Sequence, residues 1–155
     1  MSLISYQRER ARDLWADINP LLQVHWREIA TYEDIPLDPD VDRYNAMDDA
    51  GAMRCYTARA EGALIGYAVF SLATNMHYRS SAIAVQDVLF VLPEHRKTRA
   101  GLGLIRYTER ELKKEGVILI LQHEKIANPE LGVILERLGY EALETIRGKR
   151  LDKGD

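Results

Sequence analysis

The segment RKTRAGLG at residues 96–103 combines three cationic side chains with two glycines, directly before a stretch of helical periodicity. The first N–H groups of a helix have no partner within the helix, and the helix dipole adds partial positive charge at this end. Glycines let a ligand approach the backbone closely, while Arg96, Lys97 and Arg99 add charge and forked hydrogen bonds. The pattern is typical of an anion site, and pyrophosphate is the expected guest.

Other phosphate-binding motifs do not fit this segment. A Walker loop ends in Gly-Lys-Ser/Thr, and a dinucleotide fingerprint needs three glycines after the first strand of a βαβ unit. A lone Gly-x-Gly can also be an ordinary strand-to-helix turn with a solvated basic face. A phosphate-binding regulatory domain for nucleotides would use the same features, so these alternatives stay open.

Asp87 is an isolated carboxylate in an otherwise largely apolar stretch, a few residues before the cationic segment. Burial there would disfavour its charge, which is how proteins tune a carboxylate for proton transfer at neutral pH. The same residue could instead hydrogen-bond a neighbouring loop or cap a backbone group. Gln86 could orient a water molecule beside it. Asp87 is therefore a candidate general base.

Hydrophobic periodicity predicts the elements that position these residues, beginning with the N-terminal part. Apolar side chains recur at three- and four-residue spacings through residues 6–18, and the pattern resumes over residues 21–29 after Pro20. Because proline breaks a helix, we predict two consecutive helices. Residues 31–51 are acidic and contain two prolines, which predicts a loop with a short helix at residues 43–50.

Runs rich in Val, Ile, Tyr and Thr predict strands at residues 53–60, 63–72, 82–91, 117–121 and 140–147. The first two form a hairpin that turns at Glu61-Gly62. The short continuous apolar run at residues 117–121 is typical of a buried parallel strand.

Two further helices are predicted between and after the later strands. One covers residues 101–115 with Gly116 as its C-terminal cap, and the other begins at Asn128-Pro129, which supply a cap and a first-turn proline. The order of elements predicts an α/β fold with a mixed sheet and helices on its faces.

Length and composition limit the classes of protein. With 155 residues and 46% hydrophobic content, residues 1–155 are expected to form one domain with its own core. A net charge of -3 argues against a nucleic-acid or membrane-surface role. The single cysteine, Cys55, excludes an internal disulfide framework, and no signal-like or membrane-spanning apolar run is present, so a cytoplasmic location is expected. The histidines lack zinc-site spacing, and no metal is expected.

The block VLFVLPEHRKTRAGLGLIRYTEREL resembles motif A of the GNAT superfamily of N-acetyltransferases. That motif is a strand, then Pro-Glu-x-Arg, then Arg/Gln-x-x-Gly-x-Gly/Ala opening a helix. Arg96 takes the first place and Gly101 the last, whereas Arg99 stands where the first glycine is usual. The order of elements and Leu138-Gly139-Tyr140 are similar too, and the Arg-Ala-Gly loop is similar to those of phage-associated members. The resemblance implies a mixed, mostly antiparallel central sheet with helices on both faces.

The resemblance also implies a reaction. Acetyl-CoA would be the donor, and an amine would attack its thioester directly in a ternary complex without an acyl-enzyme. The end of the strand before the loop would hold the pantetheine arm, the loop would hold the pyrophosphate, and Asn128 would contact the CoA arm. The residues expected to bind acetyl-CoA are Leu89, Phe90, Val91, Arg96, Lys97, Arg99, Ala100, Gly101, Leu102, Gly103 and Asn128.

The general acid of the family is missing from its usual place. Counting back from Leu138-Gly139-Tyr140, that place is filled by Leu135. Tyr78, Tyr107 or His123 could substitute, although each could equally have a packing or surface role. The thiolate could also leave unassisted, because a thiol has a pKa of only about 8.5.

The acceptor is expected to be the primary amine of a small molecule or a peptide. In the superfamily, the first two helices and their loop shape the acceptor pocket, and here they carry an acidic run at residues 33–49 that would attract an amine. The run could also be merely solvated. Homodimers are common in the family. The rival interpretation is a non-catalytic acyl-CoA-binding module, suggested by Leu135 and Arg99.

Overall fold

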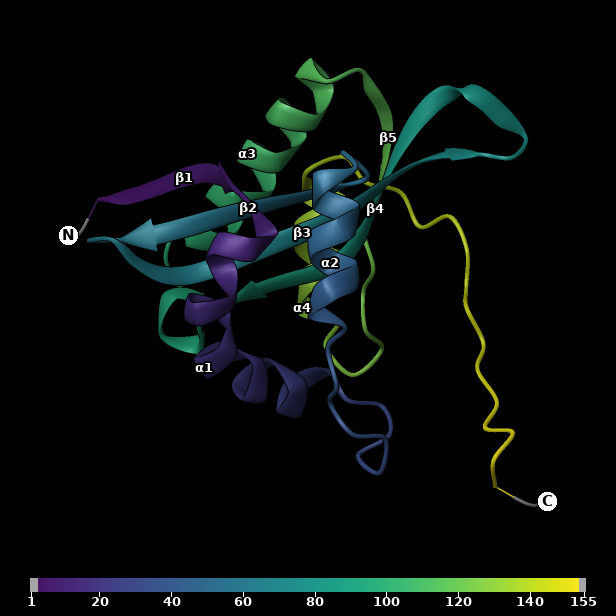
Figure 1. The fold of residues 1–155 in the computed structure, drawn as a ribbon, viewed down its shortest axis with the longest axis horizontal. Coiled ribbons are helices and arrows are strands. Elements are labelled where there is room, and N and C mark those ends of the chain that lie inside the picture. Colours follow the sequence, from purple (N-terminus) through teal and green to yellow (C-terminus); the bar gives the residue numbers. More distant parts are fainter. Residues whose placement is uncertain (1–2, 154–155) are drawn as a thin grey trace. The chain divides into compact units, whose positions relative to one another are not determined.

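The computed structural model describes residues 3–153, which form two compact units, residues 3–123 and residues 124–153. The first unit holds a β-sheet covered by helices, and the second holds helix α4 (Glu130–Arg137). Figure 1 follows these elements along the chain.

Within residues 3–123, five strands form one sheet in the order β1-β2-β3-β4-β5. The strands are β1 (Ile4–Glu9), β2 (Met53–Ala60), β3 (Ala63–Asn75), β4 (Tyr78–Val91) and β5 (Val117–Leu121). Neighbours from β1 to β4 pair antiparallel, and β5 pairs parallel to β4. The expected mixed, mostly antiparallel sheet is confirmed.

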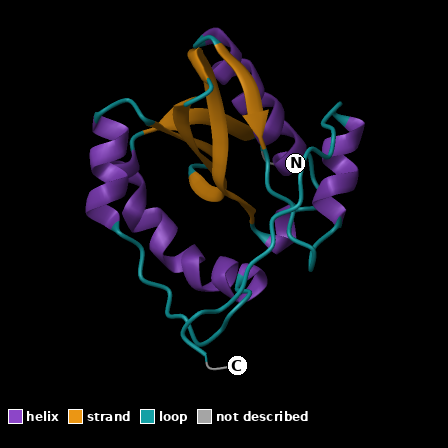
Figure 2. Cartoon of the chain, turned by 90° about the vertical axis from the view of Figure 1, so that its right-hand side faces the viewer, coloured by secondary structure: helices purple, strands orange, loops and turns teal. Residues whose placement is uncertain are grey.

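Helices cover both faces of this sheet (Figures 1 and 2). They are α1 (Ala11–Ile29), α2 (Val41–Asp49) and α3 (Ala100–Lys114). Consecutive strand residues point to opposite faces, so Cys55 packs with Leu14 of α1 while Tyr56 packs with Leu104 of α3. Each fully buried side chain of this size stabilises the fold by about 1.5–3 kcal/mol.

The predicted turns at the ends of these elements are confirmed. Glu61 and Gly62 both have positive φ, 51° and 85°, as a two-residue hairpin turn between twisted strands requires. Gly116 has a φ of 83° and ends α3.

The N-terminal prediction of two helices is wrong in two respects. Ile4–Glu9 is strand β1, in which Tyr6 leaves its helical pattern to stack on Tyr107 of α3. Tertiary packing therefore overrides the local periodicity. After it, α1 continues through Pro20 as one helix. Proline removes only one hydrogen bond and its φ suits a helix, so α1 is not broken there, and Figure 1 shows it changing direction along its length.

Strand β5 is parallel to β4, as expected, but it is not buried. Ile118 is 71% exposed, because β5 lies at the edge of the five-stranded sheet and has one neighbouring strand. A continuous apolar run cannot by itself distinguish a central strand from an edge strand.

In the second unit, helix α4 confirms the helix predicted after Asn128. The structure puts Pro129 in the cap position and shows no side-chain cap there, so the predicted capping role of Asn128 is wrong. Residues 140–147 form no strand, and Leu143 and Ile146 are exposed. Alternating apolar residues make a strand only where a neighbouring strand supplies hydrogen bonds, and this segment has none.

Candidate active site

A short 3-10 turn (Pro93–His95) leads from β4 into the cationic segment, whose last residues begin α3. The Ala100 N–H donates to Thr98 Oγ1 at 3.1 Å, and the Gly103 N–H donates to the Arg99 carbonyl at 2.8 Å. Between them, the N–H groups of Gly101 and Leu102 have no partner within residues 3–153. This end of α3 therefore keeps two free donors for an anion.

The three cations of this segment have different surroundings. Arg96 donates from Nε to the Val91 carbonyl at 2.8 Å and forms a 2.6 Å ion pair with Glu28 of α1. Its guanidinium also lies 5.6 Å from the centre of the Phe90 ring. Arg96 therefore ties the end of β4 to α1, whereas the exposed Lys97 and Arg99 side chains face solvent beside the free N–H groups.

The two glycines of the segment also differ. A Cβ on Gly103 would overlap the hydroxyl of Tyr6, which itself donates to the Arg99 carbonyl at 3.2 Å. A Cβ on Gly101 would meet only Val91, at 3.8 Å. The prediction that both glycines serve phosphate approach is therefore too simple, because Gly103 makes room for a tyrosine.

The end of β4 that precedes the segment is open along one edge. Its pairing with β5 ends at Val85, opposite Leu121, so Leu89, Phe90 and Val91 have no strand partner on that side within residues 3–153. On the other side they pair with β3. The resemblance assigns this open edge to a pantetheine arm.

Asp87 lies at a β-bulge in β4. Val69 of β3 pairs with Val88 and Phe70 pairs with Gln86, so Asp87 is the extra residue between them. A bulge re-aims the side chain it carries. Asp87 is exposed, contrary to the expected burial, because the bulge turns it to the mouth of a cavity rather than into the core.

Tyr44 of α2 donates a 2.6 Å hydrogen bond to Oδ2 of Asp87. Burial and this bond together raise the pKa of Tyr44 well above its ordinary range, so the phenol stays a donor. Sequence reasoning missed Tyr44. The sequence feature that could have identified Tyr44 is its position in the short helix predicted within the acidic loop.

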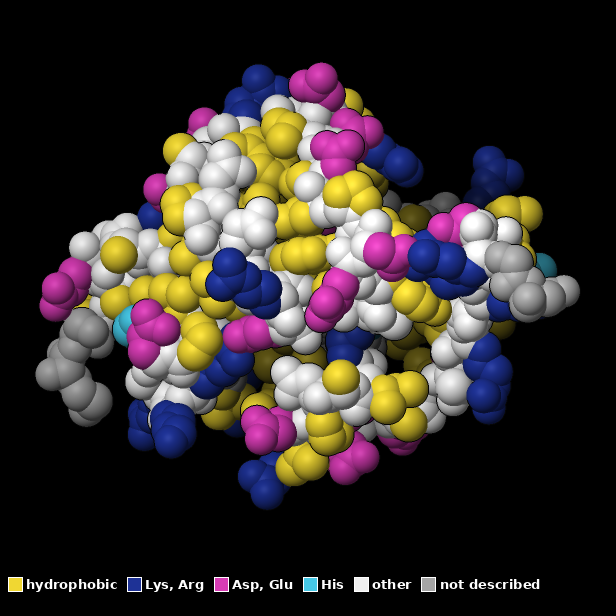
Figure 3. Space-filling model, turned by 90° about the horizontal axis from the view of Figure 1, so that it is seen from below, with side chains coloured by type: hydrophobic (Ala, Val, Ile, Leu, Met, Phe, Trp, Pro, Cys, Tyr) yellow, Lys and Arg dark blue, Asp and Glu magenta, His cyan; other side chains and the backbone are white. Residues whose placement is uncertain are grey.

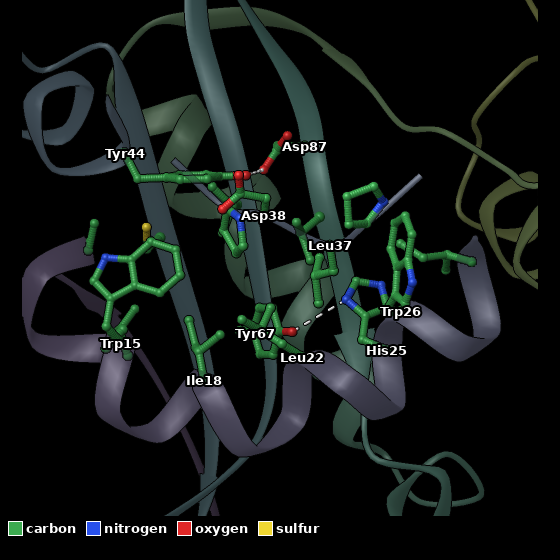
Figure 4. Close-up of a pocket in the computed structure, with 18 residues that line it drawn as sticks. Trp15, Ile18, Leu22, His25, Trp26, Leu37, Asp38, Tyr44, Tyr67 and Asp87 are labelled. Atoms are coloured by element: carbon green, nitrogen blue, oxygen red, sulfur yellow. Dashed lines mark hydrogen bonds between the residues drawn. The ribbon is translucent and has the colours of Figure 1, made fainter. Parts of the chain in front are cut away.

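A cavity of about 320 Å³ lies between α1, α2, residues 36–39 and the sheet. Figure 4 shows Asp38, Tyr44 and Asp87 together at one end, across from Ile18 and Leu22 of α1. The residues that line it are Ala11, Leu14, Trp15, Ile18, Leu22, His25, Trp26, Ile29, Pro36, Leu37, Asp38, Pro39, Tyr44, Cys55, Tyr67, Val69, Asp87 and Val88. Burial raises the pKa of the Cys55 thiol to about 12, so this cavity residue is not a thiolate at neutral pH.

His25 joins the cavity to the open end of β4. Its ring lies 4.7 Å from the ring of Phe90, and its Nδ1 is 3.3 Å from the hydroxyl of Tyr67. Sequence reasoning placed His25 in the apolar pattern of the helix predicted after Pro20 and rejected it as a zinc ligand, but it did not connect His25 with a cavity. The sequence feature that could have placed His25 at the cavity is its position on the same helical face as Leu21 and Leu22.

The candidate acids do not gather at this cavity. Tyr107 lies on α3, half-buried between Tyr6 and Tyr56, and Tyr78 is 63% exposed at the start of β4. Gln86 accepts from the His123 N–H at 3.0 Å, so its amide oxygen holds the backbone after β5 rather than a water beside Asp87.

The acidic run divides into structural and exposed carboxylates. Asp48 accepts from the Ala11 N–H at 2.9 Å and from Arg10 at 2.7 Å, so it caps α1, while Asp49 pairs with Arg10 and Arg12. Asp38 is exposed and lines the cavity. The face drawn in Figure 3 mixes acidic, basic and hydrophobic side chains.

Two further features concern residues 3–153 as a whole. They contain no group of three or more His, Cys, Asp or Glu side chains placed to hold a metal ion. None of their helices combines the length and apolar character needed to cross a membrane.

Comparison with known protein families identifies the family of this chain. The sequence model of the Acetyltransferase (GNAT) family matches residues 14–140, from α1 to the residues after α4. The chain belongs to this acetyltransferase family. The GNAT acetyltransferase is thus an N-acetyltransferase with acetyl-CoA as its co-substrate, as the motif around Arg96 and Gly101 implies. No curated protein matches its sequence.

Solved structures share the fold of this GNAT acetyltransferase. A ribosomal-protein-alanine N-acetyltransferase from Brucella melitensis biovar Abortus 2308 has a TM-score of 0.73 at 15% identity, over 96% of this chain and 99% of its own. An aminoglycoside acetyltransferase from an uncultured soil metagenomic sample, in complex with sisomicin, has a TM-score of 0.72 at 14% identity, over 97% of both chains. Aminoglycoside N-acetyltransferase AAC(6')-Iy in complex with CoA has a TM-score of 0.71 at 19% identity, over 99% and 97%.

Proposed function

We propose that residues 1–155 act as a single-domain enzyme that transfers the acetyl group of acetyl-CoA to the primary amine of a small molecule or peptide. The observation that carries the proposal is the cavity whose polar end holds Asp87 and whose wall reaches His25, in contact with Phe90 at the open end of β4. An acceptor in the cavity would thus meet a thioester lying along Leu89, Phe90 and Val91. The similar structures named above include enzymes for ribosomal-protein and aminoglycoside acceptors, which supports both acceptor classes.

The donor would bind along the open edge of β4 and over the start of α3. The free N–H groups of Gly101 and Leu102, with Lys97 and Arg99, would hold the pyrophosphate, while Ala100 and Gly103 shape the same turn. Arg96 would fix the end of β4 through its bond to the Val91 carbonyl. Asn128, in the second unit, stays a candidate for the CoA arm on the resemblance alone.

Transfer would proceed by direct attack in a ternary complex. The Asp87 carboxylate accepts one proton from the acceptor ammonium, the amine nitrogen forms a bond to the acetyl carbon, and the carbon–sulfur bond breaks. The nitrogen loses its second proton to the departing thiolate, directly or through water, so the products are the amide and the CoA thiol. Tyr44 holds Asp87 in place. A covalent route through Cys55 is disfavoured, because a buried thiol with a pKa of about 12 is a poor nucleophile.

The test is release of free thiol from acetyl-CoA in the presence of primary amines, with mass spectrometry of the acetylated product. The enzyme should release thiol above background with at least one amine and lose that release when Asp87 becomes Asn. A non-catalytic acyl-CoA-binding module would bind acetyl-CoA without release for any amine. This alternative is motivated by Leu135, which is buried where the family's usual acid would stand.

A further inference from the structure

The wall of the cavity is apolar over most of its extent. Trp15, Trp26 and Tyr67 supply aromatic surface, and Ile18, Leu22 and Leu37 supply aliphatic surface. Its carboxylates are Asp38 and Asp87, which Figure 4 shows together at one end. The cavity therefore offers one place for an ammonium group and apolar surface for everything attached to it.

This lining selects against acceptors with several separated cations. Burying an ammonium group without a charged or hydrogen-bonding partner is costly, and the α1 side of the cavity offers Ile18, Leu22 and Trp26 instead. A ring or a short alkyl chain gains free energy on the same surface by leaving water. At about 320 Å³ the cavity is near the small end of the range for small-molecule sites.

A second, more polar hollow lies on the other side of the Tyr44–Asp87 pair. It shares Asp38, Pro39, Tyr44 and Asp87 with the first cavity and extends toward Asp40, Arg43, Ser71 and Val85. Val85 belongs to the part of β4 that is paired with β5, so this hollow leads away from the open end of β4. An acceptor there would lie farther from the thioester position than one against Val88 and His25.

Resting on the proposed function, we infer that the acceptor is a primary monoamine with an apolar body, of the arylalkylamine or alkylamine class. Its ammonium group binds between Asp38 and Asp87, and its apolar body packs against Ile18, Leu22 and Trp26. Polyamines and aminoglycosides are poor acceptors, because their additional cations would face an apolar wall.

The tryptophans of the chain can be used to detect a ligand in this cavity. The two tryptophans, Trp15 and Trp26, both line the apolar cavity, and neither lines the polar hollow. Intrinsic tryptophan fluorescence therefore reports a ligand in the apolar cavity, whether or not any acetyl group is transferred.

The experiment titrates the protein with 2-phenylethylamine, hexylamine, spermidine and kanamycin, following tryptophan fluorescence and thiol release from acetyl-CoA. We expect 2-phenylethylamine and hexylamine to change the fluorescence with saturation and to give kcat/KM about tenfold or more above spermidine and kanamycin. Release with spermidine or kanamycin as the better substrates would overturn the inference and leave the proposed function standing.

Two neighbouring leucines of α1 give a matched pair of variants. Leu22 lines the cavity and Leu21 does not, although both are half-buried against the same core. Leu22→Asn should raise the KM for 2-phenylethylamine about fivefold or more with little change for acetyl-CoA, while Leu21→Asn should leave both within about twofold. Equal effects of the two variants would overturn the inference.

The two measurements also separate the inference from the proposed function. If the monoamines change the fluorescence with saturation but no amine gives thiol release, the cavity binds the inferred class of ligand and the proposed function is wrong.

Discussion

The hydroxyl of Tyr44 and the carboxylate of Asp87 are joined by a 2.6 Å hydrogen bond that links α2 to the bulge of β4. The bond fixes the direction of a carboxylate that solvent and the cavity can both reach. It also places a neutral donor, rather than a cation, beside the proposed general base.

The first prediction concerns this pair. Asp87→Asn should lower kcat about a hundredfold or more, because the amide cannot take a proton from the acceptor, while the Kd for acetyl-CoA stays within about twofold. Thiol-release kinetics and calorimetric titration measure the two quantities. Unchanged turnover across the pH range would remove Asp87 from the mechanism.

Tyr44→Phe is a milder variant that tests the same pair of residues. Loss of the hydrogen bond leaves the carboxylate present but unfixed, so kcat should fall about tenfold with an unchanged KM for acetyl-CoA. An equal rise in the KM values of both substrates would instead point to a general disturbance of α2.

The second prediction separates the arginines of the loop. Arg99→Ala removes an exposed side chain beside the free N–H groups, so it should weaken CoA about tenfold and leave a pantetheine analogue without pyrophosphate nearly unaffected. Arg96→Ala breaks the contacts to Val91 and Glu28, so it should weaken both ligands. Isothermal titration with CoA and with the truncated analogue measures the difference. Equal losses for the two ligands in Arg99→Ala would contradict its phosphate role.

The third prediction uses the two glycines at the start of α3. Gly103→Ala should lower the free energy of unfolding by about 1–3 kcal/mol, because its Cβ overlaps the Tyr6 hydroxyl. Gly101→Ala should leave the stability unchanged or higher, since the nearest atom would be 3.8 Å away. Urea unfolding at pH 7 gives both values. A destabilised Gly101→Ala together with a neutral Gly103→Ala would show that the Tyr6 hydroxyl does not fill the space beside Gly103.

The fourth prediction concerns stability at alkaline pH. Burial raises the pKa values of Tyr44, Tyr56 and Tyr67 in the folded protein. The stability tied to these protons is complete below the unfolded tyrosine pKa of about 10 and is lost above it, because only the unfolded chain then releases them. Urea unfolding from pH 8 to pH 11 should show a falling free energy of unfolding above about pH 10.

Tyr56→Phe provides the control for this fall. The Tyr56 hydroxyl is buried with no hydrogen-bond partner among residues 3–153, so removing it should be neutral or stabilising by about 1 kcal/mol at pH 7. Above pH 10 the variant should lose stability less steeply, by at most about 1.4 kcal/mol per pH unit. A slope identical to that of the parent protein would show that Tyr56 does not contribute to the alkaline loss.

The local motif could be predicted from sequence, whereas the cavity could not. The cationic loop, the helix that follows it and the hairpin at Glu61-Gly62 depend on residues next to one another in the chain. Tyr44 and Asp87 are separated by 43 positions and meet only because α2 packs against the sheet. The bulge at Asp87 depends on the register with β3, which no pattern within β4 reveals.

The same distinction explains the errors at the two ends of the chain. Tyr6 fits a helical pattern, yet pairing with β2 and stacking on Tyr107 place it in a strand. Residues 140–147 fit a strand pattern but have no partner that would stabilise one. In both cases the deciding contact lies far away in sequence.

The cap that Asp48 places on the first N–H of α1 has a mechanical consequence. Through this bond and the ion pair between Asp48 and Arg10, the end of α2 is joined to the start of α1, so the two helices that line the cavity are linked directly. Residues 36–39, which also line the cavity, form no backbone hydrogen bond to α1. Substitution of residues 36–39 is therefore the change that should alter the selectivity for amines with the least disturbance of α1 and α2.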